Sequence, residues 1–276
     1  MEGHFTVLEQ FTNNAFTKTK KWINDGIIES ETDMIRIVVL NICEECQFQC
    51  PSCPRSMGYP NRKIYMDIKT VRKIRERLDE IHFKGMISIS GMGEPGLHPD
   101  LLEICSILYP YPIKIITNGF SDADYEHISL YANIYISIHN TMHFPYLKKK
   151  FADINVVFRN HDIMSDRCEL IQTNRGGWIN KNTIDNSCYF PFYKICIDYD
   201  GSYLLCPDDW NRNSKKSDIN IYTTDIKTYF CDYLKPVKQV LLTEGRIKKP
   251  CSQCSANGIL MGDKIIEEYL CRFKKE

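Results

Sequence analysis

The sequence predicts an α/β protein in which an incomplete parallel barrel precedes a smaller α+β domain. From residue 34 to residue 175, short β-branched runs alternate with amphipathic stretches, which is the pattern of repeated strand-helix units. After Gly176-Gly177 this alternation stops, and a polar segment and a second group of cysteines follow. The 276 residues suffice for one large domain or two modest ones. We therefore expect an N-terminal extension over residues 1–33, a barrel over 34–180 and a second domain over 181–276.

Six strands are expected in the barrel, at residues 35–42, 86–90, 113–117, 134–139, 154–158 and 168–173. Because a closed barrel of this kind has eight strands, six strands with short crossovers predict a partial (β/α)6 TIM-like barrel. In the second domain, residues 188–206 predict two strands around Asp200-Gly201, a dipeptide typical of hairpin turns.

The clearest helix is expected over residues 66–81. Its apolar residues recur at spacings of three and four, Lys and Arg occupy the other face, and Asp67 is a suitable N-cap. Residues 100–108 and 122–130 predict further crossover helices. Helices are also expected from Thr228, at the C-terminus, and over residues 6–22.

Composition excludes several classes of protein. Hydrophobic residues make up 43% and charged residues 25%, as in globular chains. Lys plus Arg equals Asp plus Glu, at 35 each, which argues against nucleic acid or an anionic membrane as the main partner. No apolar run approaches the ~20 residues of a membrane helix, and the N-terminus is polar. We expect a cytoplasmic protein, in which 13 cysteines point to metal binding or redox chemistry.

The sharpest motif is Cys46-Gln-Phe-Gln-Cys50-Pro-Ser-Cys53, directly after the first expected strand. Three thiolates in one loop can hold three irons of a 4Fe-4S cluster and leave the fourth iron open for another ligand. A zinc loop is the alternative, but zinc sites usually pair two Cys-x2-Cys knuckles and no partner lies nearby in sequence. Cys43 is a fourth thiol in this loop, which the spacing does not require.

This motif resembles the hallmark Cys-x3-Cys-x2-Cys of the radical S-adenosylmethionine (SAM) superfamily. The resemblance continues at Ser90-Gly91-Met92-Gly93-Glu94-Pro95, which is similar to the segment that receives the methionyl amino group of SAM. Glycines allow close approach of the backbone, and a carboxylate is the natural partner of an ammonium group.

Other expected SAM contacts follow later strands. By the resemblance, Thr117 and Asn118 after the third strand, and Ser137 with His139 at the end of the fourth, contact the ribose and carboxylate of SAM. His139 is equally consistent with a strand-end histidine that is satisfied by backbone. Ser52 stands where the family usually has an aromatic residue that helps to seat adenine, so this sequence departs from the pattern there.

The second group of cysteines comprises Cys188, Cys206, Cys251 and Cys254, which come from the hairpin and a later loop. By spacing alone, four such thiolates could hold structural zinc. The pattern resembles the SPASM domain in its truncated form, called twitch, which implies one auxiliary 4Fe-4S cluster. Only Cys271 follows these ligands, so no second auxiliary cluster is expected.

The resemblance implies that SAM is reductively cleaved to a 5′-deoxyadenosyl radical, with electrons from a flavodoxin- or ferredoxin-type reductant. Thr173-Asn174-Arg175-Gly176-Gly177 resembles the Asn-Arg-Gly-Gly segment of 2-deoxy-scyllo-inosamine dehydrogenases, which are twitch enzymes that oxidise a cyclitol alcohol. It implies that Arg175 lies among the SAM carboxylate and substrate hydroxyls, where a guanidinium fork is well suited.

Two fates of a substrate radical are open. Hydrogen loss from a carbinol carbon of a sugar or cyclitol, with an electron passed to the auxiliary cluster, would give a ketone. Return of hydrogen by a thiol, with Cys231 or Cys271 as candidates, would give an epimer. The acid or base that moves the hydroxyl proton would be Arg175 or His139.

The competing interpretations are a peptide-modifying maturase and, outside enzymes, an iron-sulfur electron carrier or a zinc-stabilised binding module. Only 33 residues precede the barrel, fewer than a leader-binding module needs. A non-enzymatic role would leave the segment from Gly91 to Glu94 without a purpose.

Overall fold

The computed structural model describes residues 29–51, 53–160, 173–179, 183, 188–256 and 258. Several predictions lie outside these residues. They are the helix over 6–22, the C-terminal helix, the sixth barrel strand up to residue 172, and the site residues Ser52 and Cys271.

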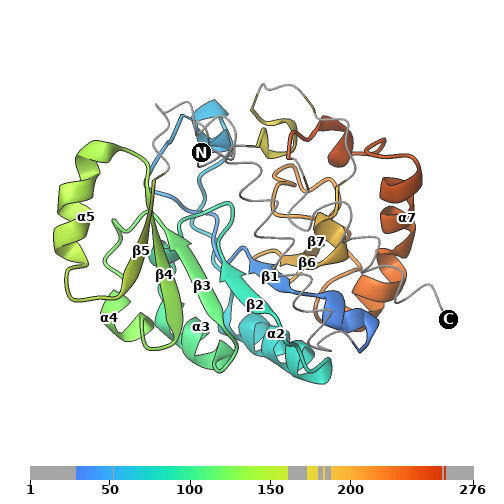
Figure 1. Cartoon of the computed structure of the whole chain (residues 1–276), viewed down its shortest axis with the longest axis horizontal. Coiled ribbons are helices and arrows are strands. Elements are labelled where there is room, and N and C mark those ends of the chain that lie inside the picture. Colours follow the sequence, from blue (N-terminus) through green and yellow to red (C-terminus); the bar gives the residue numbers. More distant parts are fainter. Residues whose placement is uncertain are drawn as a thin grey trace, which may run out of the picture.

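The described strands form one seven-stranded sheet in the order β5-β4-β3-β2-β1-β6-β7 (Figure 1). Their bounds are β1 Ile37–Leu40, β2 Met86–Ile89, β3 Ile113–Thr117, β4 Ala132–Ile138, β5 Val156–Asn160, β6 Lys194–Ile197 and β7 Tyr203–Leu204. All neighbours pair in parallel except β6 and β7, which form the antiparallel hairpin expected around Asp200-Gly201. The predicted α/β class and the first five barrel strands are therefore confirmed, with ends shifted by a few residues.

The helices are α2 Ile68–Glu80, α3 Leu101–Leu108, α4 Tyr125–Ile128, α5 Phe144–Lys150 and α7 Lys235–Thr243. Asp67 caps α2 as predicted, because its carboxylate accepts the backbone N–H of Thr70 at 2.6 Å. The helix expected from Thr228 begins as a π-helical turn, Thr228–Tyr233, and continues as α7. Helix α5 was not predicted.

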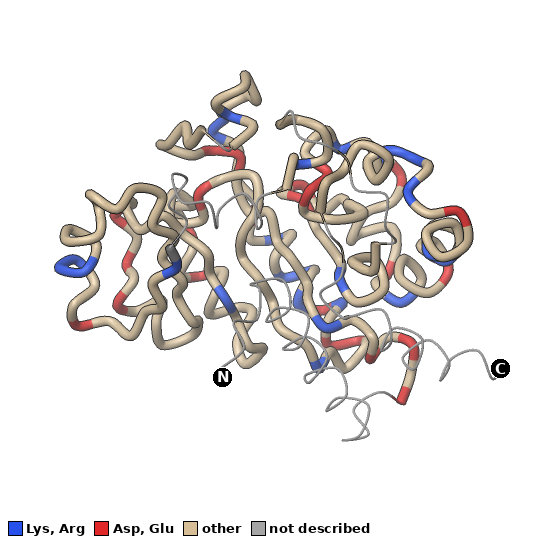
Figure 2. The backbone as a smooth tube through the Cα atoms, turned by 45° about the horizontal axis from the view of Figure 1, so that its top comes forward, with Lys and Arg blue, Asp and Glu red and all other residues tan. Residues whose placement is uncertain are grey.

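Short 3-10 turns complete the described secondary structure. They are Glu31–Met34, Pro54–Met57, Pro95–Leu97, Thr141–His143, Arg175–Gly177, Phe190–Phe192 and Cys251–Gln253. Within the described residues, no helix combines the length and the apolar character that crossing a bilayer requires. Acidic and basic positions lie interspersed along the chain (Figure 2).

The two faces of β1 belong to different apolar clusters. Val38 and Leu40 lie in the main core with α2 and α3, whereas Val39 packs in a smaller core that also contains Met92 and Cys196. Alternate strand residues point to opposite faces, so this small core lies on the sheet face away from α2 and α3. That face is the inner face of the partial barrel.

The hairpin joins the sheet beside β1. Leu40 pairs with Ile197, and the backbone N–H of Asn41 donates to the carbonyl of Ile197 at 2.9 Å. Asn41 and Asp198 therefore emerge side by side at the carboxyl ends of two parallel strands. This is the edge at which barrels of this kind place their sites.

His98, just before α3, gives a prediction for stability against pH. It is 3% exposed; its Nδ1 accepts the N–H of Asp100 at 3.1 Å and its Nε2 donates to the carbonyl of Met66 at 2.9 Å. These bonds require the neutral ring, and burial lowers the pKa of His98. Below about pH 6.5 the histidine binds a proton in the unfolded chain but stays neutral in the folded chain. The free energy of unfolding therefore decreases as the pH is lowered, by at most about 1.4 kcal/mol per pH unit.

Urea unfolding at pH 7.5 and 6.0 checks this expectation. A His98→Gln variant, which does not titrate there, should lose less stability than the wild type between the two values. An equal loss in both proteins would show that His98 is not the group responsible.

Candidate functional site

The loop after β1 carries the three cysteines of the first motif and folds back on itself. The backbone N–H of Cys46 donates to Asn61 Oδ1 at 2.9 Å, and Asn61 Nδ2 donates to the carbonyl of Cys46 at 3.0 Å. The N–H of Cys53 donates to the carbonyl of Cys50 at 2.9 Å. Burial, followed by the neighbouring Cys46 and Cys53 thiolates, raises the pKa of Cys50 to about 11. The structure thus brings the three predicted ligands together.

The Gly-rich segment after β2 packs directly against this loop. A Cβ on Gly93 would lie 2.3 Å from the carbonyl oxygen of Cys43, so only glycine fits there. The N–H of Glu94 donates to the carbonyl of Glu45 at 2.7 Å, and Cys43 Sγ donates to the carbonyl of Glu94 at 3.1 Å. Cys43 is buried and acts here as a thiol donor, whereas a ligand role is predicted for Cys46, Cys50 and Cys53.

Arg55 joins the two segments a second time. Its Nη2 donates to the carbonyl of Glu44 at 2.6 Å and also to the carbonyl of Met92. Its Nη1 donates to Asn61 Oδ1 at 2.9 Å. Arg55 is 5% exposed and follows Cys53 by two residues, a position that the sequence analysis did not single out. It fixes the distance between the cysteine loop and the Gly-rich segment.

The carboxylate of Glu94 lies in a cradle of donors. Its Oε1 accepts the N–H of Gly96 at 2.9 Å and the hydroxyl of Thr117, and its Oε2 accepts the N–H of Asn118 at 2.8 Å. The residue is 4% exposed, and burial raises the pKa of the Glu94 carboxyl. Glu94 therefore fixes the loop after β3, and its oxygens retain room for a further donor such as an ammonium group.

Residues of three loops meet beside Glu94. Gln47 Nε2 donates to Asn118 Oδ1 at 3.1 Å, which ties the cysteine loop to the loop after β3. The rings of Phe48 and Phe120 lie edge to face at 5.1 Å, and Phe120 lies 4.9 Å from His143. The predicted contacts Thr117 and Asn118 thus lie in the same site as the cysteines.

The ends of β4 and β5 add a polar group. Ser137 is 5% exposed and pairs in register with Arg159 on β5. Burial, and then the positive charges of Arg159 and Arg175, lower the pKa of His139, so its imidazole is held neutral. Within the described part of the chain, the guanidinium of Arg159 makes no hydrogen bond or ion pair, and burial lowers its pKa. The strand predicted over residues 154–158 ends one residue before Arg159, so Arg159 was not among the predicted site residues.

The predicted segment with Arg175 lies between this site and the second group of cysteines. Arg175 adopts a left-handed backbone conformation with φ of +52°, and its Nη1 lies 3.3 Å from Asp208 Oδ1. Asn174 holds the segment to the loop of the last two cysteines, because its Nδ2 donates to the carbonyl of Gln253 at 2.6 Å and its Oδ1 accepts the N–H of Ser255 at 2.9 Å.

The four cysteines of the second group line one pocket. Its walls are Gly176, Cys188, Phe190, Cys206, Asp208, Arg246, Pro250, Cys251, Cys254 and Ala256. Burial raises the pKa of Cys206 well above its ordinary value, and the charges of Asp208 and the other three thiols raise it further. The guanidinium of Arg246, which is 6% exposed, acts in the opposite direction on Cys251 and Cys254.

Both donor sets fit an iron-sulfur cluster by their chemistry. One loop supplies three thiols, which leaves an iron open, and three separate segments supply four thiols, which would close a cluster completely. Across the described residues, no three Cys, His, Asp or Glu side chains are already arranged as ligands of one metal ion. The fit therefore rests on the type of the donor atoms and on their placement in one loop or around one pocket.

Cys231 lies elsewhere. Its turn, Thr228–Tyr233, contacts Glu31–Met34, which precedes β1 at its amino end. Burial and the charge of Glu31 raise the pKa of Cys231 to about 12.

Cys196 is placed differently, because it shares the small core of the inner face with Met92 and Cys53. The sequence offers no spacing signal that would have selected Cys196.

No protein-family model and no curated protein matches this sequence. Solved structures do match. BtrN in complex with AdoMet and 2-DOIA has a TM-score of 0.69 and 21% identity, over 81% of this chain and 94% of that chain. BtrN in an open conformation has a TM-score of 0.60 and 19% identity, over 80% and 92%.

A third match is SuiB of Streptococcus suis bound to the precursor peptide SuiA. It has a TM-score of 0.57 and 15% identity, over 93% of this chain and 77% of that chain. BtrN is a radical SAM 2-deoxy-scyllo-inosamine dehydrogenase, and SuiB is a radical SAM enzyme of ribosomal peptides. This chain has the radical SAM fold.

The radical SAM fold explains the common position of the residues described above. The cysteine loop, the segment with Gly91 and Gly93, and the loop with Thr117 follow successive parallel strands, so they meet at one edge of the sheet. The predicted partial barrel and the resemblance to the superfamily are confirmed. At 21% identity or less, these matches establish the fold and leave the reaction to be argued from the site.

Proposed function

We propose that this protein is a radical SAM enzyme that oxidises or epimerises a carbinol carbon of a sugar or cyclitol-like substrate. One observation carries the proposal. In a radical SAM fold, the loop that carries the three thiols lies against the Gly-rich segment at the carboxyl edge of the sheet.

Cys46, Cys50 and Cys53 would hold a 4Fe-4S cluster with one iron open to SAM. When bound and reduced, cluster and SAM together supply a 5′-deoxyadenosyl radical. The chain's own residues bind and orient SAM: Glu94 offers acceptor oxygens to the amino group, and Arg159 with Ser137 offers donors to the carboxylate. The half-buried guanidinium of Arg159, which has no anionic partner among the described residues, is well suited to a carboxylate.

The second site supports oxidation. Cys188, Cys206, Cys251 and Cys254 line one pocket and would hold an auxiliary 4Fe-4S cluster able to accept an electron. Arg175 lies between the two sites, where its guanidinium can orient a substrate hydroxyl. BtrN, which has this fold, was solved with AdoMet and 2-DOIA. Epimerisation would need a thiol near the substrate, and the inner-face position of Cys196 suits this role better than that of Cys231.

His139 is proposed as the base that accepts the hydroxyl proton. Its pKa is lowered by burial and by the neighbouring positive charges, which keeps the imidazole neutral near pH 7. Replacing His139 by Gln should lower the kcat for substrate oxidation by about 10²–10⁴-fold, with little change in the affinity for SAM.

The pH profile tests this assignment. In the wild type the rate should fall on the acid side, as pH drops below the ordinary histidine range and His139 becomes protonated. In the His139→Gln variant, the residual rate should not show this decrease on the acid side. A variant that keeps the wild-type profile would assign the base elsewhere.

A peptide-modifying activity is the second candidate. It is favoured by SuiB, a protein solved with a precursor peptide, which matches over 93% of this chain. The substrate would then bind to the same carboxyl edge, because both candidates use the same SAM site.

Anaerobic reconstitution followed by an assay for 5′-deoxyadenosine tests the proposal. The protein would receive SAM, dithionite or a flavodoxin system, and a panel of aminocyclitols, sugars and peptides. Stimulation by a polyol with loss of two hydrogens supports a dehydrogenase, and solvent deuterium gained without a change in composition supports an epimerase. Stimulation by peptides alone supports the second candidate. Clusters without release of 5′-deoxyadenosine under any condition would overturn the enzyme assignment.

A further inference from the structure

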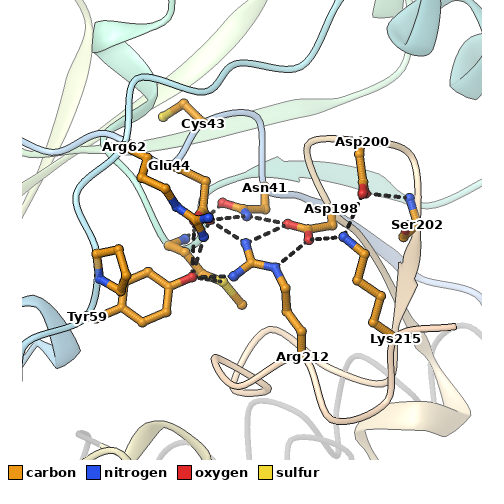
Figure 3. Close-up of polar contacts among 12 residues, drawn as sticks. Asn41, Cys43, Glu44, Tyr59, Arg62, Asp198, Asp200, Ser202, Arg212 and Lys215 are labelled. Carbon is orange, nitrogen blue, oxygen red and sulfur yellow. Dashed lines mark hydrogen bonds and ion pairs between the residues drawn. The ribbon is translucent and has the colours of Figure 1, made fainter. Parts of the chain in front are cut away.

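A buried ion network joins the hairpin region to the SAM-binding edge, and Arg212 lies at its centre (Figure 3). Arg212 Nε donates to Asp198 Oδ2 at 2.6 Å and its Nη2 donates to Asp198 Oδ1 at 3.1 Å. The same Nη2 also contacts Glu44 Oε1, and Nη1 donates to the hydroxyl of Tyr59. The side chains of Glu44 and Asp198 are fully buried.

These carboxylates belong to segments far apart in the sequence. Glu44 lies in the loop that carries Cys46, Cys50 and Cys53, whereas Asp198 directly follows β6. Lys215 also reaches Asp198, at 3.3 Å, and Arg62 reaches Glu44, also at 3.3 Å. Among the described cations, Arg212 is the one with ion pairs to both carboxylates.

The network ends on the backbone of Met92. Asn41 Nδ2 donates to Asp198 Oδ1 at 2.6 Å, and Asn41 Oδ1 accepts the N–H of Met92 at 3.0 Å. On the other side, Arg55 donates both to the carbonyl of Glu44 and to the carbonyl of Met92. Both backbone polar groups of Met92 are thus held by side chains that contact the partners of Arg212. Met92 lies between the glycines of the SAM-binding segment.

The loop around Arg212 is shaped to present this side chain. Arg212 has a φ of +54°, a left-handed conformation that is unfavourable for a residue with a Cβ. Asp209 holds the loop, because its carboxylate accepts the N–H groups of Asn213 and Ser214 at 2.9 and 2.8 Å. Such a conformation persists only where other contacts stabilise it. Here the stabilising contacts include those of the Arg212 guanidinium with Glu44 and Asp198, which lie at the carboxyl edge of the sheet.

We propose that Arg212 is a positioning residue for SAM: through Asp198, Asn41 and Glu44 it holds the Gly91–Met92–Gly93 backbone at the spacing from the cysteine loop that SAM binding requires. The inference deepens the proposed function and rests on it for the identity of the ligand. The region beyond β6 would therefore affect SAM affinity without touching SAM.

The test compares Arg212→Lys, Arg212→Met and Asn41→Ala in the anaerobically reconstituted full chain. The matched control is Arg72→Met, which breaks an ion pair between exposed side chains, Arg72 and Glu103. Hydrogen exchange of residues 90–97 reports on the segment itself, and equilibrium binding reports the dissociation constant for SAM. Cluster content, measured as iron, confirms that each variant is loaded alike.

Arg212→Met should accelerate exchange in residues 90–97 and weaken SAM binding by about tenfold or more, whereas the control changes neither. Arg212→Lys should recover part of the affinity, because it keeps the charge but loses the fork. Asn41→Ala should act through the same contacts as Arg212→Lys. The dissociation constant for SAM should therefore rise less in the double variant than the product of the two single-variant increases.

Other outcomes overturn the inference. Unchanged exchange and unchanged affinity in Arg212→Lys and Asn41→Ala would show that the network is structural only, and this holds even if Arg212→Met fails to fold. Multiplicative effects in the double variant would show two independent roles. If the wild type does not bind SAM, the proposed function fails, while exchange of residues 90–97 still decides the role of Arg212.

Discussion

A variant with Cys46, Cys50 and Cys53 all replaced by Ala is expected to release no 5′-deoxyadenosine and to bind about four irons per chain, against about eight in the wild type. The charges of Cys46 and Cys53 act on the thiol of Cys50 in the same loop, so we expect the three to serve as one ligand set. The four thiols around the second pocket come from other segments and should keep their cluster. Iron and sulfide analysis with a SAM-cleavage assay measures both effects.

Cys105→Ala is the matched control, because Cys105 is a buried residue of α3 in the main core. It should lower stability modestly and leave iron content and SAM cleavage intact. SAM cleavage in the triple variant would contradict the assignment of the first cluster. A wild type with about four irons and one zinc would instead make the second site structural.

Gly93→Ala is expected to abolish SAM cleavage although it adds a single methyl group. The new Cβ would lie 2.3 Å from the carbonyl oxygen and 2.7 Å from Sγ of Cys43, and the backbone there cannot turn away as a flexible side chain would. The Gly-rich segment must therefore separate from the cysteine loop, at a cost of about 1–3 kcal/mol in the free energy of unfolding. SAM binding and thermal unfolding measure the two effects.

Gly245→Ala provides the comparison. Gly245 also has a positive φ, +76°, but nothing lies within 4 Å of its added Cβ. This variant should show only the cost of a left-handed backbone for a residue with a Cβ, about 1–2 kcal/mol, with SAM cleavage unchanged. Wild-type cleavage in Gly93→Ala would mean that the contact with Cys43 does not set the SAM site.

Local patterns predicted most of the barrel. The helical spacing of Ile68, Val71, Ile74 and Leu78 and the cap at Asp67 predicted α2 to within two residues at either end. The β-branched runs predicted β1 to β5, because buried parallel strands leave a continuous apolar signal in the sequence. Helix α5 escaped prediction, since Phe144–Lys150 is short and most of its residues are exposed or half-buried.

For the site, the sequence by itself determined which donor types stand close together: the spacing of Cys46, Cys50 and Cys53 and the glycines beside Glu94 are local features that can be read without the fold. The ligand role of these cysteines is a prediction from that spacing. Only the tertiary structure decided which distant residues join them. Arg55 and Arg212 carry no spacing signal, because their partners lie on other strands and loops. Asp198 contacts Asn41 directly, and Arg212 links it to Glu44, because β6 pairs with β1. That pairing is a property of the folded sheet and leaves no trace in either segment alone.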